Sequence, residues 1–253
     1  MRQLIVTIMA GGMGKRMMSN VPKALHKVND LPMIVRIINA VLPLTPHKII
    51  VVVAPSVHEM IADAVKSAVP EVVYNKVGFV VQPTAQGTGH AIQCTLPLFD
   101  GVDDSAVNLI LCGDTPLLQS NELVAMYASF RSELQVTGIH LDNPHGYGRI
   151  LMNGKSFERI VEENDCTDGQ KLLNLVNCSI YFVAVGILKR FVPTIKNINS
   201  KNEYYLTDLV EIAHNAGHNI SVSVMDASLS DHIMNVNTPE QLQTANQLAV
   251  WSD

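Results

Sequence analysis

Short apolar runs rich in valine and isoleucine alternate with longer segments of helical period, and this alternation constrains the fold more than any other feature of the chain. The clearest runs are QLIVTIM (3–9), KIIVVVA (48–54), GFVVQ (78–82) and AVNLILC (106–112). Segments 32–42, 56–68 and 88–95, which lie between them, have the pattern of helices. Strands that alternate with crossover helices indicate a parallel sheet, and unbroken apolarity suits strands covered on both faces. We therefore predict an α/β fold with a Rossmann-like, mixed, mostly parallel sheet flanked by helices.

The remaining segments fit the same class. We expect a helix over 120–133, strands over 134–141 and 177–185 and on both sides of Asn153-Gly154, and helices over 207–217 and from Pro239. Asn-Gly is a strong signal for a two-residue hairpin. Pro32 suits the first turn of one helix, Ser56 is a candidate N-cap of the next, and Thr238 with Gln241 can form a capping box. Because no linker or hexapeptide repeat interrupts the pattern, we predict a single domain over 1–253.

Charge and cysteine content narrow the class of function. A net charge of -5 gives no general attraction for nucleic acid or an anionic membrane. No apolar run approaches the ~20 residues of a membrane helix. The four cysteines form neither a C-x-x-C pair nor a zinc-like spacing. We expect a cytoplasmic protein whose partner is a small phosphorylated ligand, and nothing in the sequence indicates its oligomeric state.

The stretch MAGGMGKRM (9–17) follows the first predicted strand and has the composition of a phosphate-binding loop. A Walker A loop would need Gly where Met9 stands and Ser or Thr where Arg16 stands. A dinucleotide fingerprint fails at Met17, where a small residue is required. What remains is a glycine-rich turn whose amides can bind an anion, with Lys15, Arg16 and Lys23 as nearby cations. A plain strand-to-helix turn with solvated cations is the alternative.

Two further stretches follow predicted strands at the same edge of the sheet. In QPTAQGTGHAI (82–92), amides at Gly87 and Thr88 can meet the same ligand, and Gln82 can pair with a base edge. In LILCGDTPLL (109–118), Asp114 ends a buried strand, where a lone charge needs a partner. The alternatives are ordinary turn chemistry for the first stretch and a turn-capping role for Asp114.

A magnesium ion that carries substrate phosphates would be a suitable partner for Asp114. In MNVNTPEQL (234–242), Asn237 precedes the cap of the last helix, and its amide oxygen is a second hard ligand. Asn235 is a competitor for this role, and a turn-forming Asn237 is the structural alternative. The sequence therefore predicts Asp114 and Asn237 as Mg²⁺ ligands.

Neutral hydrogen-bonding groups and one carboxylate cluster in four later stretches: GYGRI (146–150), IVEEND (160–165), LVNCS (175–179) and NEYYLTD (202–208). Such groups suit sugar hydroxyls. The candidate sugar-binding residues are Gly148, Glu162, Asn177, Tyr205 and Thr207. Glu163, Asp165 and Asp168 are instead interpreted as a solvated acidic loop.

Taken together and in this order, these stretches resemble the sugar-nucleotidyltransferase family, and within it the uridylyltransferase domains of bacterial N-acetylglucosamine-1-phosphate uridylyltransferases. The matching motifs are MAGGMGKRM followed by PKAL, then QPTAQGTGHA, CGDTPL, NPHGYGRI and EYYLTD. The resemblance runs from about Leu4 to Leu248. It implies transfer of UMP from UTP to a sugar 1-phosphate, with Mg²⁺ and release of pyrophosphate. The acetyltransferase domain of the bifunctional bacterial enzymes has no counterpart in this sequence.

Carried over position by position, the resemblance assigns roles to individual residues. Arg16 and Lys23 would be the catalytic cations, and Asp114 with Asn237 would hold the metal. The nucleotide-binding positions would be Ala10, Gly11, Gly12, Gly14, Gln82, Gly87, Thr88 and Gly113. The five candidate sugar-binding residues would hold the amino sugar phosphate.

The sequence departs from the family pattern at several of these stretches. Met13 and Lys15 stand where a basic residue and Thr are usual, Cys112 replaces an aromatic residue, and Cys178-Ser179 replaces Thr-Gly. Two alternatives therefore stay open for the function. One is a nucleotidyltransferase for another sugar 1-phosphate or phosphorylated alcohol, and the other is a non-catalytic nucleotide-sugar sensor.

Overall fold

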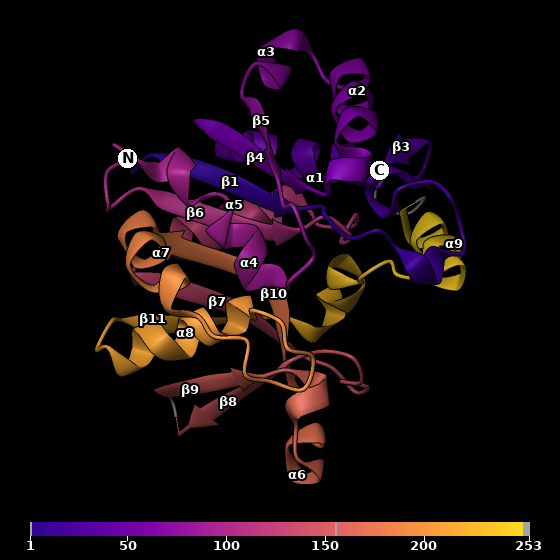
Figure 1. Cartoon of the computed structure of the whole chain (residues 1–253). Coiled ribbons are helices and arrows are strands. Elements are labelled where there is room, and N and C mark those ends of the chain that lie inside the picture. Colours follow the sequence, from indigo (N-terminus) through magenta and orange to yellow (C-terminus); the bar gives the residue numbers. More distant parts are fainter. Residues whose placement is uncertain (1, 155, 250–253) are drawn as a thin grey trace. The chain divides into compact units, whose positions relative to one another are not determined.

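The computed structural model describes residues 2–154 and 156–249, and the chain divides into two compact units (Figure 1). We call residues 4–85, 111–128 and 231–253 the glycine-loop unit, and residues 1–3, 86–110 and 129–230 the hairpin unit. Each unit is assembled from segments that are separated in the sequence. Neither unit is therefore a contiguous piece of chain, and the expectation of a single domain stays a prediction.

Three parallel strands form the sheet of the glycine-loop unit: β1 (Leu4–Met9), β4 (Lys48–Val53) and β5 (Val77–Val81). Strand β4 pairs with β1 on one side and with β5 on the other. Five of the six residues of β1 and of β4 are buried, as expected for strands covered on both faces. A short antiparallel ribbon joins β2 (Lys27–Val28) to β3 (Leu31–Pro32).

The helices of this unit are α1 (Met33–Val41), α2 (His58–Ala68), α3 (Glu71–Tyr74), α5 (Ser120–Ser129, whose last residue falls in the hairpin unit) and α9 (Pro239–Ala249). Short 3₁₀ turns connect them: η1 (Lys15–Met17), η2 (Lys23–Leu25), η3 (Leu42–Leu44) and η4 (Pro55–Val57). Helix α2 packs against β5 and α1, beside the strands (Figure 1).

Two local expectations about helix starts were wrong. Pro32 lies in β3, opposite Lys27, and α1 begins one residue later, because the Met33 amide donates to the His26 carbonyl (2.9 Å). Ser56 does not cap α2, because Pro55 starts the 3₁₀ turn η4 and the helix begins only at residue 58. At α9, by contrast, the predicted capping box is confirmed.

Antiparallel pairing dominates the hairpin unit. Its strands are β6 (Val107–Cys112, whose last two residues fall in the glycine-loop unit), β7 (Leu134–His140), β8 (Arg149–Asn153), β9 (Ser156–Val161), β10 (Leu175–Ala184) and β11 (Ile220–Met225). Strand β10 pairs antiparallel with β6, β7 and β8, whereas β11 pairs parallel with β7. The predicted hairpin joins β8 to β9, and Gly154 adopts the left-handed conformation (φ 61°) that this turn requires.

The helices of the hairpin unit are α4 (Thr88–Gln93), α6 (Asp168–Lys171), α7 (Val185–Phe191) and α8 (Leu206–Asn215). Its 3₁₀ turns are η5 (Leu96–Phe99), η6 (Glu163–Asp165) and η7 (Val192–Thr194), and η8 (Ala227–Ile233) leads from this unit into the other. Helix α5 ends before the predicted residue 133, because the Ser132 hydroxyl donates to the Leu134 carbonyl (3.0 Å) and closes a turn ahead of β7.

The predicted fold class is confirmed: an α/β fold with a mixed, mostly parallel sheet flanked by helices. The apolar runs named from the sequence are strands β1, β4, β5 and β6 with ends shifted by at most one residue. Among residues 2–154 and 156–249, no helix is long and apolar enough to cross a bilayer.

Candidate active site

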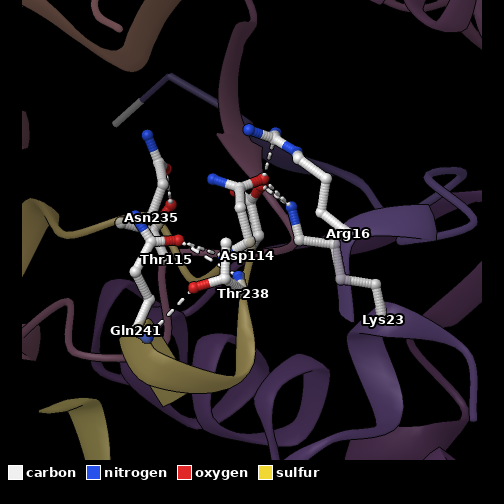
Figure 2. A network of polar contacts seen from close by, with 8 residues as sticks. Arg16, Lys23, Asp114, Thr115, Asn235, Thr238 and Gln241 are labelled. Carbon is white, nitrogen blue, oxygen red and sulfur yellow. Dashed lines mark hydrogen bonds and ion pairs between the residues drawn. The ribbon is translucent and has the colours of Figure 1, made fainter. Parts of the chain in front are cut away.

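Four residues predicted to act together on phosphates and metal meet in the glycine-loop unit (Figure 2). The Lys23 ammonium forms an ion pair with Asp114 Oδ2 and donates to Asn237 Oδ1 at 2.6 Å. Arg16 Nη2 donates to the same Asn237 oxygen at 3.0 Å. The side chain of Lys23 is 13% exposed and that of Asp114 22% exposed, so their charges are only partly solvated. Two cations and two oxygen-bearing side chains from distant parts of the chain thus form one network.

An apolar cluster beneath this network explains why the segments meet. Met17, Leu117 and Val236 are buried together, and each lies within three residues of Arg16, Asp114 or Asn237 in the sequence. The backbone amide of Val236 also donates to the carbonyl of Asp114 (2.8 Å). The large side chain of Met17, which excluded a dinucleotide fingerprint, therefore has a structural role: it anchors the end of the glycine loop in the core.

Gln241 of helix α9, labelled beside Thr238 in Figure 2, holds the backbone of Asn237 in place. Gln241 Oε1 accepts from the Asn237 amide at 2.7 Å and from the Thr238 amide at 3.2 Å, and the Gln241 amide donates to Thr238 Oγ1 at 3.3 Å. The capping box was predicted as a helix start, but its contact with the backbone of Asn237 was not. Asn235, the competitor for the metal role, instead accepts from the Thr115 hydroxyl at 3.4 Å.

Close backbone packing explains the glycines at this site. Gly14 has φ 65°, and a Cβ there would lie 2.7 Å from Lys23 Cβ, so only glycine lets the lysine stem pass. A Cβ at Gly113 would lie 2.9 Å from the Met9 carbonyl. A Cβ at Gly11 would lie 3.0 Å from Gln82 Oε1, which places the buried Gln82 against the loop. Ala10 is buried beside Gly113, whereas Gly12 faces open space.

The other two predicted nucleotide-binding residues belong to the hairpin unit. Gly87 has φ 103°, and a Cβ there would lie 2.5 Å from the Tyr204 carbonyl, which excludes any other residue. The Thr88 hydroxyl accepts from the Leu206 amide at 3.0 Å, and the Gly89 amide donates to Tyr204 at 2.7 Å. These bonds join the start of α4 to the start of α8, so the stretch has a structural role whether or not it also binds nucleotide.

Four of the five candidate sugar-binding residues are linked in the hairpin unit. The Thr207 hydroxyl donates to Glu162 Oε1 at 3.0 Å, and the Asn177 amide donates to the Gly148 carbonyl at 2.9 Å. A Cβ at Gly148 would lie 3.6 Å from Glu162 Oε2, so this glycine lies close to the carboxylate. Burial raises the pKa of Glu162, and the Thr207 hydrogen bond opposes that effect.

Tyr205, the fifth of these residues, shares a cavity of about 350 Å³ with Glu162. Asp165, Asp208 and Glu211 also line this cavity, which therefore carries an excess of acid groups. Burial raises the pKa of Tyr205 to about 12, and burial together with the neighbouring Glu211 raises that of Asp208 to about 6. The cavity is polar and anionic, which suits a ligand rich in hydroxyl groups.

The side chain of Asn177 is already used within the protein. Its Nδ2 donates to the Tyr181 hydroxyl at 2.6 Å, and its Oδ1 accepts from the Ser179 amide at 3.1 Å. Ser179 adopts φ 58° where the register of β10 against β7 shifts. The family pattern has glycine at this position. Ser179 is therefore a strained residue beside the predicted sugar site.

An ion pair that the sequence did not predict supports the same region. Arg149 is 1% exposed, and its Nη1 lies 2.7 Å from Glu163 Oε2. It also donates to the carbonyls of Tyr147, Lys171 and Leu173. The interpretation of Glu163 as a solvated residue was therefore wrong, because the buried guanidinium requires a counter-charge. Asp165 and Asp168 are exposed, as interpreted.

Asp114 and Asn237 have the chemistry of a site for a hard divalent cation. Their oxygens already converge on one cationic group, the Lys23 ammonium. Asp114 Oδ1 is buried without a hydrogen-bond partner in the described part of the chain. A carboxylate and an amide oxygen suit Mg²⁺, which keeps several waters and takes phosphate oxygens as further ligands. No cluster of three or more His, Cys, Asp or Glu suited to a metal occurs within 2–154 and 156–249.

Comparisons with known proteins find similar sequences over most of the chain. Residues 6–173 match the family model of the MobA-like NTP transferase domain. A protein of Acanthamoeba polyphaga mimivirus named probable UDP-N-acetylglucosamine pyrophosphorylase is 46% identical over 246 residues, which cover 95% of this chain and 94% of that protein.

Longer bacterial relatives match as well. The bifunctional protein GlmU of Geotalea uraniireducens is 35% identical over 252 residues, which cover 98% of this chain and 53% of the relative. GlmU of Francisella philomiragia subsp. philomiragia is 38% identical over 249 residues, which cover 98% and 52%. The chain spans about half the length of these bacterial relatives. It belongs to the family of MobA-like NTP transferase domains.

Proposed function

We propose that this protein transfers UMP from UTP to N-acetylglucosamine 1-phosphate, giving UDP-N-acetylglucosamine and pyrophosphate, with Mg²⁺ as cofactor. The observation that carries the proposal is the network of Arg16, Lys23, Asp114 and Asn237 beside a glycine loop. The name of the mimiviral relative supports UTP and the amino sugar phosphate as substrates. The polar, anionic cavity at Glu162 supports an acceptor rich in hydroxyl groups.

The reaction needs no general base from the protein. A phosphate monoester has a second pKa near ~6, so the acceptor is largely dianionic at neutral pH. One of its oxygens forms the new bond to the α-phosphorus of UTP, and the bond from that phosphorus to the bridging oxygen breaks. Pyrophosphate leaves with the electron pair. Catalysis then consists of alignment and of stabilising negative charge on the phosphate oxygens.

The residues of the glycine-loop unit suit that task. Arg16 is exposed and Lys23 half-buried, so both guanidinium and ammonium can reach a phosphate while their stems stay fixed by Met17 and Gly14. Asp114 and Asn237 would hold the metal. When bound, Mg²⁺ supplies positive charge to the phosphate oxygens. Gln82, packed on Gly11, is the candidate for contact with the base.

In the hairpin unit, Glu162 and Thr207 are the candidate acceptors and donors for sugar hydroxyls. Their hydrogen bond uses Glu162 Oε1, which leaves Oε2, the oxygen nearer Gly148, as an acceptor for the ligand. Tyr205 lines the same cavity. Asn177 would contact the sugar through the second hydrogen of Nδ2 and the second lone pair of Oδ1, which its bonds to Tyr181 and Ser179 leave unused.

A pyrophosphate-release assay tests the proposal. We expect release with UTP and N-acetylglucosamine 1-phosphate, and a loss on the order of 10²-fold or more for Asp114→Asn and Arg16→Ala, by analogy with removal of one preorganised donor. The exposed Lys66→Ala variant on α2 is the matched control.

Each other outcome points to a different function. A clear preference for CTP would make the protein a different nucleotidyltransferase, and a preference for another acceptor would change only the sugar. Tight binding of UDP-sugar without pyrophosphate release would instead indicate a sensor. Near-normal release by Asp114→Asn would refute the assigned roles.

A further inference from the structure

The Lys23 ammonium lies on the two oxygens that are the candidate metal ligands. It contacts Asp114 Oδ2 and Asn237 Oδ1. We infer that Lys23 is a built-in occupant of the metal site, which a divalent cation must displace, and that bound nucleotide phosphates favour this exchange by drawing the ammonium away. The inference rests on the proposed function and adds an order of binding to it: the metal binds weakly until the nucleotide is bound.

The lone pairs of Asn237 Oδ1 support the exchange. An amide oxygen has two lone pairs. One accepts from Lys23 and the other from Arg16 at 3.0 Å. Because both are used, this oxygen cannot ligate a metal until at least one cation withdraws. Gln241 bonds to the backbone amide of Asn237 and not to its side chain, so a change of partners at the side-chain oxygen leaves that backbone contact intact.

Charge supports the exchange as well. The Lys23 ammonium forms an ion pair with the partly buried Asp114 carboxylate, and a metal would have to take over that pairing. A cation already beside the carboxylate weakens the attraction for a second one, most strongly where solvent screening is incomplete. Asp114 Oδ1, which is buried without a partner in the described chain, is the ligand atom left over for the incoming ion.

The structure also allows the ammonium to move without rebuilding the loop. Lys23 Cβ is held against Gly14, where an added Cβ would come within 2.7 Å. The three stem carbons beyond Cβ are joined by rotatable bonds, so the head group can turn toward phosphates while the backbone stays fixed. Arg16 is exposed and can do the same. If phosphate draws Lys23 away, nucleotide and metal each tighten the binding of the other by the same factor.

The test measures metal binding without turnover. Mn²⁺ alone is titrated into nucleotide-free protein, and free Mn²⁺ is followed by electron paramagnetic resonance. We expect Lys23→Met to bind Mn²⁺ about tenfold tighter than wild type. Lys15→Met removes one positive charge from the preceding 3₁₀ turn η1, and we expect its affinity to match wild type. Asp114→Asn added to Lys23→Met should abolish the gain, which would assign the ion to this site.

The inference is overturned if Lys23→Met binds Mn²⁺ no tighter than wild type, or if Lys15→Met tightens binding equally, since general charge would then suffice. Lys23→Gln repeats the measurement should the methionine variant fail to fold. Failure of the proposed function has a different signature. Tighter Mn²⁺ binding by Lys23→Met, together with no pyrophosphate from wild type, would leave the exchange intact and reject the reaction.

Discussion

Replacing the buried Arg149 by methionine tests how the candidate sugar site is held together. Arg149 pairs with Glu163 at 2.7 Å and donates to backbone carbonyls of Leu173 (3.0 Å), Lys171 (3.2 Å) and Tyr147. Methionine fills much of the volume but leaves the carboxylate and three carbonyls without their donor. The loss is therefore electrostatic and not a cavity effect.

Removing one member of a buried ion pair costs roughly 3–5 kcal/mol. Glu163 is 21% exposed, so water partly compensates its carboxylate and favours the lower half of that range. The three carbonyls that lose a charged donor together add only about 1 kcal/mol, because Lys171 and Leu173 are exposed and water can take over as donor there. We expect Arg149→Met to lower the free energy of unfolding by about 4 kcal/mol.

Equilibrium urea unfolding followed by circular dichroism measures this loss. The matched control is Arg159→Met on β9, whose side chain is 43% exposed and has only a 3.9 Å pair with Glu158; we expect a change within about 0.5 kcal/mol. A loss below 1 kcal/mol for Arg149→Met, or equal losses for both variants, would refute the reasoning.

The same variant should weaken the binding of the sugar phosphate and leave that of UTP unchanged. Arg149 joins the neighbours of Gly148 and Glu162, so its removal loosens the candidate sugar site in the hairpin unit. At a temperature where Arg149→Met is folded, we expect the KM for the sugar phosphate to rise several-fold while the KM for UTP stays near wild type. Equal rises in both would contradict this role.

Three further variants address strain, pH and positioning. Ser179→Gly removes a left-handed serine (φ 58°) and should raise the free energy of unfolding by about 0.5–1 kcal/mol; an unchanged or lower melting temperature would contradict that. The pKa of Asp208 is raised to about 6 by burial, so the folded state holds this proton more tightly than the unfolded chain, and stability falls as pH rises from about 4 to 6. Asp208→Asn should therefore be more stable than wild type at pH 7, by roughly 1 kcal/mol after allowance for screening of this partly exposed group, with the gain vanishing near pH 4; a gain of the same size at both pH values would contradict this. Gln241→Leu leaves the Asn237 amide without its acceptor and should lower pyrophosphate release about tenfold, whereas Gln241→Glu, which keeps the acceptor oxygen, should retain most activity; equal activities would remove Gln241 from any positioning role.

What could be predicted from the sequence depended on local pattern. Strands β1, β4, β5 and β6 have unbroken apolar runs, and the capping box at Thr238 and Gln241 is a four-residue signature, so both were predictable. The start of α2 was not, because Pro55 favours a 3₁₀ turn and delays the helix beyond Ser56.

The meeting of Arg16, Lys23, Asp114 and Asn237 followed from motif order, yet the direction of each side chain did not. Sequence reasoning assigned Lys23 to phosphates and could not show that its ammonium contacts the candidate metal ligands. The pair of Arg149 and Glu163 was missed for a related reason. Five charged groups occur between 158 and 165, and only tertiary packing decides which of them a buried guanidinium selects.

The interleaving of the two units has a consequence for synthesis on the ribosome. Val236 and Asn237 lie against residues made at the very beginning of translation, since Asn237 accepts from Arg16 across a separation of 221 positions. Domains generally fold as their chain emerges. Here Arg16 and the apolar cluster around Met17 lack their C-terminal partners until a segment emerges more than two hundred residues later. Premature termination before Asn237 would therefore release a polypeptide with an open core and without the amide oxygen of its candidate metal site.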